Sequence, residues 1–272
     1  MKVAFWDRDL RKRYCEFWSM FSVFISFVLI FLSVPDEWKI VCGGIFIVIL
    51  AGSYIGMWLV ANNATSAHIV INETNVNVII GDIFEQDGLK VIGFNDFMDT
   101  IVDDKIVARG TLHGKFLKKY PEIVSELDLL LNENEMFNKN IEESNVKRDC
   151  EKNTCYKLGI VLRWNDYILT PFSKFNDDNE ACLSAEQYIE FLMNFWKNIG
   201  KVYAGNTINI PLMGAGIVRF HDGKPSKQEL LEIMIRTLKL SGFKCTYSGK
   251  SINFIIYSDD VKEIDFYHIN NM

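Results

Sequence analysis

The sequence predicts an α/β protein in which an N-terminal hairpin of two transmembrane helices precedes a three-layer α/β/α domain with a mixed sheet. Three observations predict this architecture. The first sixty or so of the 272 residues are far more apolar than the rest, they contain two long uncharged stretches, and strand-like runs alternate with helix-like runs after them. The formal net charge of -6, from 29 basic and 35 acidic residues, excludes a basic nucleic-acid-binding coat, so we expect no nucleic-acid partner.

The hairpin is predicted from two apolar segments, residues 17–34 and residues 40–61, neither of which contains a charged side chain. Roughly 20 apolar residues cross a bilayer as a helix, so both segments can span one. The polar link between them, residues 35–39, is too short for anything but a tight return, and both ends of the hairpin therefore lie on one side of the membrane. This divides the chain into an N-terminal segment (1–16), the hairpin (17–61) and a C-terminal domain (62–272).

Basic residues predict the orientation of the hairpin. Several precede the first span, whereas the link contains only Lys39 beside two acids. Because Lys and Arg favour the cytoplasmic side, we expect a multi-pass membrane protein with a cytoplasmic N-terminus and C-terminal domain. A cleaved signal peptide and a buried core hairpin are the alternatives for these segments. Gly52 and Gly56 have the small-xxx-small spacing of membrane helix contacts, either within the hairpin or between subunits.

Six scattered cysteines indicate a reducing environment, because they lack the spacing of a disulfide-stapled secreted domain. Cys150 and Cys155 form a C-x4-C pattern that suits incidental thiols, half a metal site or the closing of a hairpin. With no further ligand pair at metal-binding spacing nearby, we expect no metal site.

The C-terminal domain is predicted to alternate strands and helices. Three β-branched runs separated by turn residues predict early strands over 68–72, 75–84 and 89–94. A helix is predicted over 112–130 with an interruption at Pro121, and the polar residues 131–154 suit an exposed connection or a hairpin arm.

The second half of the domain continues the pattern. A hairpin is predicted from residues 156–164 and 167–171 around Asn165-Asp166. Amphipathic helices are predicted over 185–199, with Ser184 as N-cap and Gln187 three residues on, and over 226–240, with a capping box of Ser226 and Glu229. Further strands are predicted over 207–211 and 251–257.

Three motifs follow strands of this domain: Gly81-Asp82-Ile83, Phe94-Asn95-Asp96 and the glycine-rich residues 211–217. Ligands of open α/β sheets bind at the carboxyl ends of strands, so the three motifs can meet at one crevice. Glycines let backbone N–H groups approach a diphosphate, and a carboxylate such as Asp82 can accept a hydrogen bond from an adenine amino group. Taken alone, Gly214 and Gly216 also suit an ordinary loop.

The order of these motifs resembles that of macro domains, the ADP-ribose-binding α/β/α modules, over about residues 67–272, and the late glycine loop is the most specific part of the likeness. Two membrane spans directly before a divergent macro domain resemble the membrane-anchored effector subunits of Thoeris antiphage systems. In such a system a TIR-domain enzyme makes a nucleotide signal from NAD, and the effector senses it.

The resemblance implies which residues contact the ligand. Asp82 and Ile83 would hold the adenine, with Tyr257 stacking near it, and Asn95 would lie near the distal ribose. Arg219, outside the usual pattern, would pair with a phosphate or an added carboxylate. The two phosphate loops would comprise Gly110, Thr111, His113, Gly214, Ala215, Gly216 and Ile217.

Two departures from hydrolytic macro domains favour sensing over catalysis. Such domains commonly have a richer Asn motif and a run of glycines in the first loop, whereas residues 94–97 and 109–113 differ here. We therefore expect no catalytic residue and no cofactor. His113 is the one candidate general acid or base, and a structural or hydrogen-bonding role is its alternative.

The function that the resemblance implies is that of an antiphage effector. It would sense a TIR-produced, NAD-derived ADP-ribose-type nucleotide, such as an amino acid conjugate of ADP-ribose, then oligomerise and disrupt the cell membrane, which causes abortive infection. Two alternatives remain. A membrane-tethered ADP-ribosyl hydrolase would lose turnover when Asn95 or His113 is changed, and a passive reader of ADP-ribosylated proteins would bind without ligand-driven oligomerisation.

Overall fold

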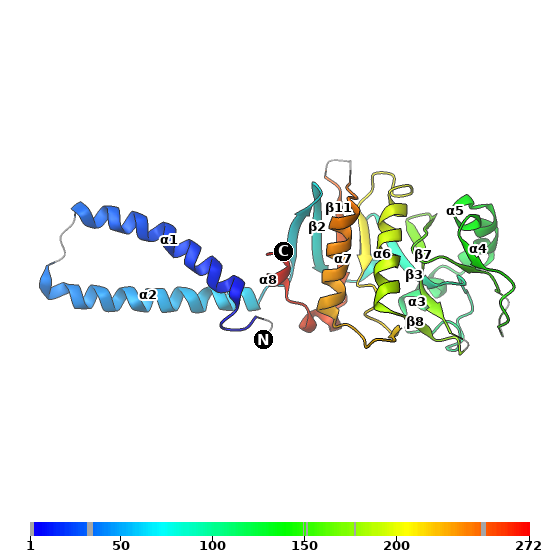
Figure 1. Cartoon of the computed structure of the whole chain (residues 1–272), viewed down its shortest axis with the longest axis horizontal. Helices are drawn as coiled ribbons and strands as arrows, with labels where there is room; N and C mark the ends of the chain where they lie inside the picture. The colour runs from blue at the N-terminus through cyan, green and yellow to red at the C-terminus, as the bar shows by residue number, and fades with distance from the viewer. Residues whose placement is uncertain (1–2, 32–34, 149, 151, 177, 246–248) are drawn as a thin grey trace. The chain divides into compact units, whose positions relative to one another are not determined.

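The computed structural model describes residues 3–31, 35–148, 150, 152–176, 178–245 and 249–272. The chain divides into two compact units (Figure 1). The first, which we call the hairpin unit, comprises Met1–Ala67 together with Ile264–Met272, and the second, the sheet unit, comprises His68–Glu263. The sheet unit is therefore inserted in sequence between the two parts of the hairpin unit.

Two long helices, α1 (Arg8–Phe31) and α2 (Asp36–Asn62), form most of the hairpin unit. Both are long and apolar enough to cross a membrane, and none of the apolar window of either is buried. Helix α1 begins at Arg8, well before the first predicted span, and residues 32–34 of that span lie outside the described residues. The helices are joined by hydrogen bonds from Tyr14 Oη to the Leu50 carbonyl (2.9 Å) and from Trp18 Nε1 to Ser53 Oγ (3.1 Å).

The glycines of α2 are not used for packing within the hairpin. A Cβ atom added at Gly43, Gly44, Gly52 or Gly56 would meet no described atom within 4 Å. The small-residue surface that the sequence places on α2 is thus open in the single chain, and the close approach of α1 to α2 does not depend on it.

The sheet unit contains a nine-stranded mixed sheet among its described residues, in the order β1-β2-β11-β9-β3-β7-β8-β10 with β6 paired to β7. Strands β2, β11, β9, β3 and β7 run parallel, whereas β6 and β8 are antiparallel to β7. The bounds are β1 (Ala67–Ile71), β2 (Thr74–Ile80), β3 (Leu89–Asn95), β6 (Leu162–Trp164), β7 (Tyr167–Phe175), β8 (Ala181–Leu183), β9 (Ile208–Pro211), β10 (Arg219–Phe220) and β11 (Ser251–Ile256). A separate pair joins β4 (Ile141–Glu143) to β5 (Cys155–Tyr156).

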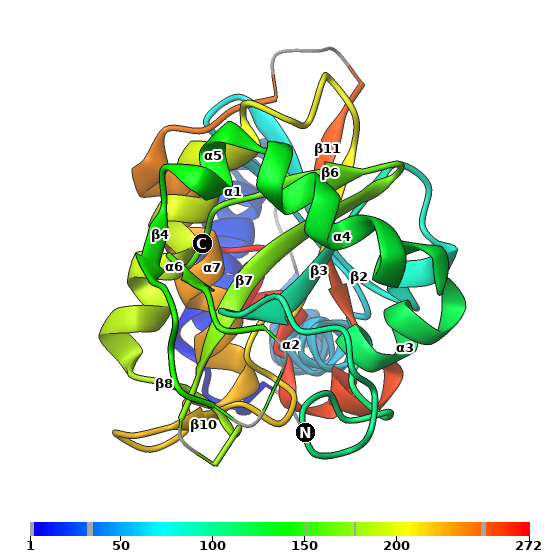
Figure 2. The ribbon, with the colours of Figure 1, turned by 90° about the vertical axis from the view of Figure 1, so that its right-hand side faces the viewer.

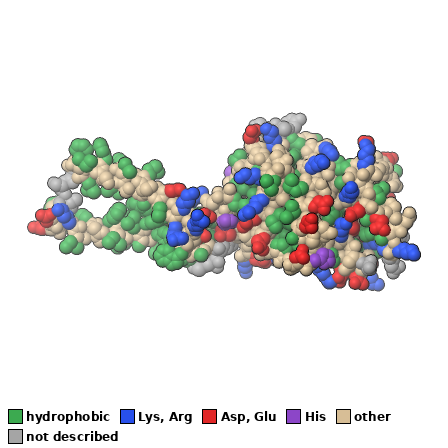
Figure 3. Space-filling model, in the orientation of Figure 1, with side chains coloured by type: hydrophobic (Ala, Val, Ile, Leu, Met, Phe, Trp, Pro, Cys, Tyr) green, Lys and Arg blue, Asp and Glu red, His purple; other side chains and the backbone are tan. Residues whose placement is uncertain are grey.

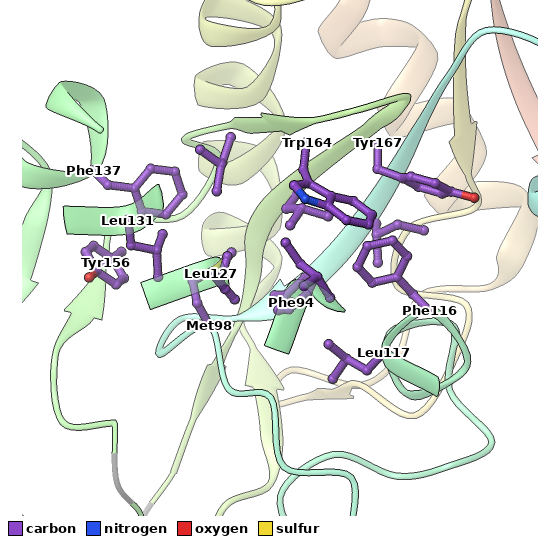
Figure 4. Packing of buried hydrophobic residues seen from close by; sticks show 14 of the residues in the cluster. Phe94, Met98, Phe116, Leu117, Leu127, Leu131, Phe137, Tyr156, Trp164 and Tyr167 are labelled. Atoms are coloured by element: carbon purple, nitrogen blue, oxygen red, sulfur yellow. The ribbon is translucent and has the colours of Figure 1, made fainter. Parts of the chain in front are cut away.

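Helices cover both faces of this sheet, which gives the three predicted layers (Figures 1 and 2). On one face, α6 packs beside α7, and Phe172 of β7 lies 4.9 Å from Phe191 of α6 between ring centroids. On the other face, the α3 residue Phe116 lies 4.9 Å from the ring of Tyr167 and 5.9 Å from that of Trp164 (Figure 4). The helices are α3 (Leu112–Lys119), α4 (Glu122–Glu133), α5 (Glu135–Asn138), α6 (Ala185–Ile199), α7 (Lys227–Ser241) and α8 (Phe266–Ile269), with 3-10 helices η1 (Ile83–Glu85) and η2 (Ser258–Glu263).

Local sequence signals set the helix ends as predicted. Ser184 and Gln187 form a capping box at α6, as do Ser226 and Glu229 at α7. Pro121 separates α3 from α4 where the sequence predicted an interruption. In the polar segment 131–154, β4 pairs antiparallel with β5, which agrees with the hairpin arm that the sequence offered beside an exposed connection, whereas α5 was not predicted. The two-residue and three-residue strands β10 and β8 were not predicted either.

Candidate functional site

The topology brings the predicted motifs to one edge of the sheet. Across the parallel strands, Ile80 lies opposite Ile256 and Pro211 lies opposite Ile255. The segments after β2, β11 and β9 therefore start at the same edge, and β3, which ends at Asn95, pairs with β9 in the same direction. This edge is the kind of crevice at which α/β sheets bind ligands.

At the end of β2, Asp82 and Ile83 lie in contrasting environments. Asp82 is exposed, and its Oδ1 atom caps η1 by accepting the Phe84 N–H at 2.9 Å. Ile83 is 5% exposed and belongs to the core. The exposed Asp82 carboxylate can accept further hydrogen bonds, whereas the buried Ile83 side chain anchors this turn in the hydrophobic core.

Two lysines of α3 lie at the same end of the sheet. The Nζ atom of Lys115 lies 5.6 Å from the ring centroid of Tyr257, which follows β11, and that of Lys119 lies 4.8 Å from the ring of Phe84. The start of α3, where Gly110, Thr111 and His113 stand, is thereby adjacent to the ends of β2 and β11. The sequence prediction omitted both lysines, because their aromatic partners are distant in the chain.

The N-terminus of α3 is well formed and open to solvent. Thr111 Oγ1 accepts the Gly114 N–H at 3.1 Å, and a Cβ atom at residue 114 would come within 2.3 Å of the Ala108 carbonyl oxygen, so glycine is required there. At Gly110 no atom of the described residues lies within 4 Å of an added Cβ atom. With no acidic side chain in the first turn, the helix dipole leaves this end electropositive.

The glycine loop after β9 is anchored to the core at its start and exposed to solvent at its end. Gly214 has φ +86°, a conformation that favours glycine, and a Cβ atom there would lie 3.3 Å from Leu230. The buried Tyr188 hydroxyl donates to the Met213 carbonyl at 2.9 Å. Beyond this anchored part, Gly216 is exposed and open around its α-carbon, and Ile217 is 65% exposed.

Ala215 and Arg219 have partners on this loop and beyond it. The Ala215 N–H donates to the Leu212 carbonyl at 3.3 Å, and its own carbonyl accepts from Lys224 Nζ at 3.1 Å. Arg219 lies on β10, at the end of the sheet order, and its guanidinium pairs with Glu180. Its side chain is 65% exposed, so the guanidinium retains donors that face solvent.

Asn95 is held in a buried polar cluster that the sequence did not predict. Its Nδ2 donates to Asp99 Oδ2 at 2.9 Å, and its Oδ1 accepts the Asp99 N–H at 3.1 Å. Arg148, from the polar segment, donates to both Asp99 oxygens at 3.1 and 2.9 Å and lies 3.8 Å from the Phe97 ring centroid. Asn95 is 2% exposed, so both ends of its amide are occupied inside the protein.

Burial dominates the ionisation of two groups near this cluster. Burial raises the pKa of Asp96 to about 7, although the Phe175 N–H and the cations Lys174 and Arg148 act in the opposite direction. Burial also lowers the pKa of His113 to about 3, and its ring centroid lies 3.7 Å from that of Phe94. At neutral pH His113 is therefore an uncharged core side chain that faces away from solvent.

A hollow of about 550 Å³ lies elsewhere, between residues 222–225 and the side chains of Glu229, Ile233 and Arg236 on α7. It contains none of the predicted ligand residues. The described residues include no group of three or more His, Cys, Asp or Glu side chains placed to hold a metal ion.

Comparisons with known proteins place the chain in a family. Among solved structures, a macrodomain mutant from Oceanobacillus iheyensis has a TM-score of 0.45 at 14% identity and covers 76% of this chain and 96% of its own. The same macrodomain with MES bound has a TM-score of 0.44 at 15% identity and covers 76% and 95%.

Two sequence matches are stronger. A family model described as Thoeris protein ThsA, Macro domain, matches residues 76–257. A relative from Bacillus amyloliquefaciens (strain Y2), Thoeris protein ThsA, is 36% identical over 253 residues, with 91% of this chain and 83% of the relative covered. The chain therefore belongs to the Thoeris ThsA family, and its sheet unit is a macro domain.

Proposed function

We propose that this protein is a sensor and effector that binds an ADP-ribose-type nucleotide, made from NAD by a TIR-domain protein, at the edge formed by β2, β11, β9 and β3. The observation that carries the proposal is the convergence of an exposed carboxylate (Asp82), an exposed aromatic ring (Tyr257), an electropositive helix start and an open glycine loop at one edge. These are the chemical partners of an adenine, a diphosphate and a sugar.

Within this proposal, Asp82 and Tyr257 contact the base, and the open backbone at Gly110, Gly216 and Ile217 faces the diphosphate. Lys115 adds positive charge between these two parts, and Arg219 offers its solvent-facing donors to a phosphate or a carboxylate. Asn95 and His113 support the site from the interior, because both side chains are buried and would have to leave their partners to touch a ligand.

Sensing fits this geometry better than hydrolysis. A general base must reach a water at the reacting bond and must accept a proton near neutral pH. His113 has a pKa of about 3, because it is buried, and Asn95 is bonded at both ends of its amide to Asp99. We infer that nucleotide binding changes the assembly of the helices of the hairpin unit in the inner membrane, with the macro domain in the cytoplasm, and that the assembled form disrupts the membrane.

The test is ADP-ribose binding by the full-length protein in detergent, measured by isothermal titration calorimetry. Gly216→Glu places a carboxylate at the open part of the loop without a steric clash, and it should weaken binding by at least about tenfold through like-charge repulsion with a diphosphate. Leu240→Glu, which adds the same charge at a side chain that is 77% exposed on α7, is the matched control. Equal affinity in the wild type and both variants would contradict the proposed site.

A further inference from the structure

The macro domain continues directly into the second part of the hairpin unit. Tyr257, at the proposed base-binding edge, is followed by η2 (Ser258–Glu263), and Ile264 begins the C-terminal part of the hairpin unit. Near the C-terminus, η2 is thus the segment that connects the proposed binding edge to the hairpin unit. Contacts that hold η2 in place therefore act on this connection.

Lys227, the first residue of α7, holds η2 at two points. Its Nζ atom donates to Asp260 Oδ1 and to Glu263 Oε1, both at 2.7 Å. The side chains of Lys227 and Asp260 are 21% and 18% exposed, so this pair is shielded more than a surface ion pair. Hydrogen bonds to the two carboxylates raise the pKa of Lys227, which keeps the ammonium charged.

Lys224, three residues before Lys227, holds the glycine loop. Its Nζ atom donates to the carbonyl of Ala215 at 3.1 Å and to that of Gly216. The two lysines are joined by a rigid helix start, because Ser226 Oγ accepts the Glu229 N–H at 3.2 Å and Glu229 Oε2 accepts the Ser226 N–H at 2.8 Å. The glycine loop and η2 are thus attached to the same few residues.

Inside the hairpin unit, the segment after Ile264 contacts α1. The ring of Tyr267 lies 5.6 Å from the Arg13 guanidinium carbon, and His268 Nδ1 lies 3.6 Å from Asp9 Oδ2. Tyr267 also packs against the small core of Val3, Leu10 and Ala61. Residues 264–269 therefore hold the start of α1 against the end of α2.

We propose that Lys224 and Lys227 are positioning residues that couple occupancy of the glycine loop to the hairpin unit. This proposal rests on the proposed function and names the regulation of that site. An anionic ligand at the loop competes with the Ala215 and Gly216 carbonyls for the Lys224 ammonium. Residues 224–227 then shift, which alters the hydrogen bonds from Lys227 to Asp260 and Glu263. This change moves η2 and with it the contacts that residues 264–269 make with α1. Such a device needs only a difference in affinity between two arrangements.

The test is hydrogen exchange, followed by mass spectrometry, on the full-length protein in detergent with and without ADP-ribose. Lys227→Met removes the charge, Lys227→Arg restores it, and Lys239→Met on the exposed last turn of α7 is the control. Without ligand, Lys227→Met should raise exchange in residues 258–272 about two- to fivefold, the range for an ion pair of this strength. With ADP-ribose, wild-type exchange should change in both 212–217 and 264–272.

In Lys227→Met, ADP-ribose should still slow hydrogen exchange in residues 212–217, but it should no longer change exchange in residues 264–272. In Lys227→Arg, the ligand should change exchange in both segments, as in the wild type. An unchanged response in 264–272 of Lys227→Met would overturn the coupling. If ADP-ribose changes exchange nowhere in the wild type, the proposed function is contradicted. The comparison without ligand then still tests the role of Lys227, because equal exchange of residues 258–272 in Lys227→Met and Lys239→Met would overturn it.

Discussion

The two units of this chain expose opposite kinds of side chain. In the hairpin unit, large apolar side chains face outward, such as Phe24 (66% exposed), Ile30 (75%) and Ile40 (87%), whereas in the macro domain Phe116 and Phe254 are completely buried. Figure 3 shows hydrophobic side chains along the two long helices and a mixture of acidic and basic side chains over the macro domain. Exposed apolar surface of this extent is typical of an interaction site, and both helices are long and apolar enough to cross a membrane.

This contrast predicts different costs for the same substitution in the two units. Phe116→Ala should lower the free energy of unfolding of the macro domain by about 3–5 kcal/mol, because it leaves a cavity between Tyr167 and Trp164. Phe24→Ala should change it by less than about 0.5 kcal/mol. Denaturant titration in detergent, followed by tryptophan fluorescence, measures both. A large loss with Phe24→Ala would show that the outward face of α1 packs against protein.

A second contrast separates buried from exposed charge within the macro domain. Arg148→Met should lower the free energy of unfolding by about 3 kcal/mol, because the Asp99 carboxylate would stay buried without its bidentate partner. Arg236→Met should lower the free energy of unfolding by only about 0–1 kcal/mol, because the Arg236 side chain that pairs with Glu232 is 67% exposed. Thermal denaturation of the two variants side by side tests the difference. Equal midpoints would mean that the Asp99 cluster adds no stability.

The smallest predicted effect is one of pH. Burial raises the folded-state pKa of Asp96 to about 7, so the folded chain holds a proton there that an unfolded carboxyl releases near pH 4. The stability that this proton gives is therefore lost progressively as the pH rises from about 4 to about 7. Asp96→Asn keeps the oxygen that accepts the Phe175 N–H and removes the charge. The stability advantage of the variant over the wild type should grow by about 1–3 kcal/mol between pH 5 and pH 8. A constant difference across this range would contradict the raised pKa.

Local signals explain what the sequence predicted well. The capping boxes at Ser184 and Ser226 act over three residues, and the apolar periodicity of α6 and α7 is continuous, so these helices were predicted nearly to the residue. The convergence of Asp82, Tyr257 and the glycine loop followed from the parallel order of the strands.

Long-range contacts explain what the sequence did not reveal. Arg148 pairs with a carboxylate 49 residues away, from a polar segment that shows no periodicity. The burial of His113 depends on Phe94 from another element, and the hold of Lys227 on η2 joins residues 33 and 36 positions apart. None of these pairs leaves a pattern in a single sequence, because each depends on how the elements pack.

The most direct test of the account is the size of the full-length protein in detergent, measured by mass photometry with and without nucleotides extracted from infected cells in which a TIR-domain partner is active. We expect larger particles only with the active extract, and we expect Gly216→Glu to abolish this growth while Leu240→Glu retains it. Binding of ADP-ribose with no change in particle size would contradict a ligand-gated effector, and it would leave a passive reader or a hydrolase.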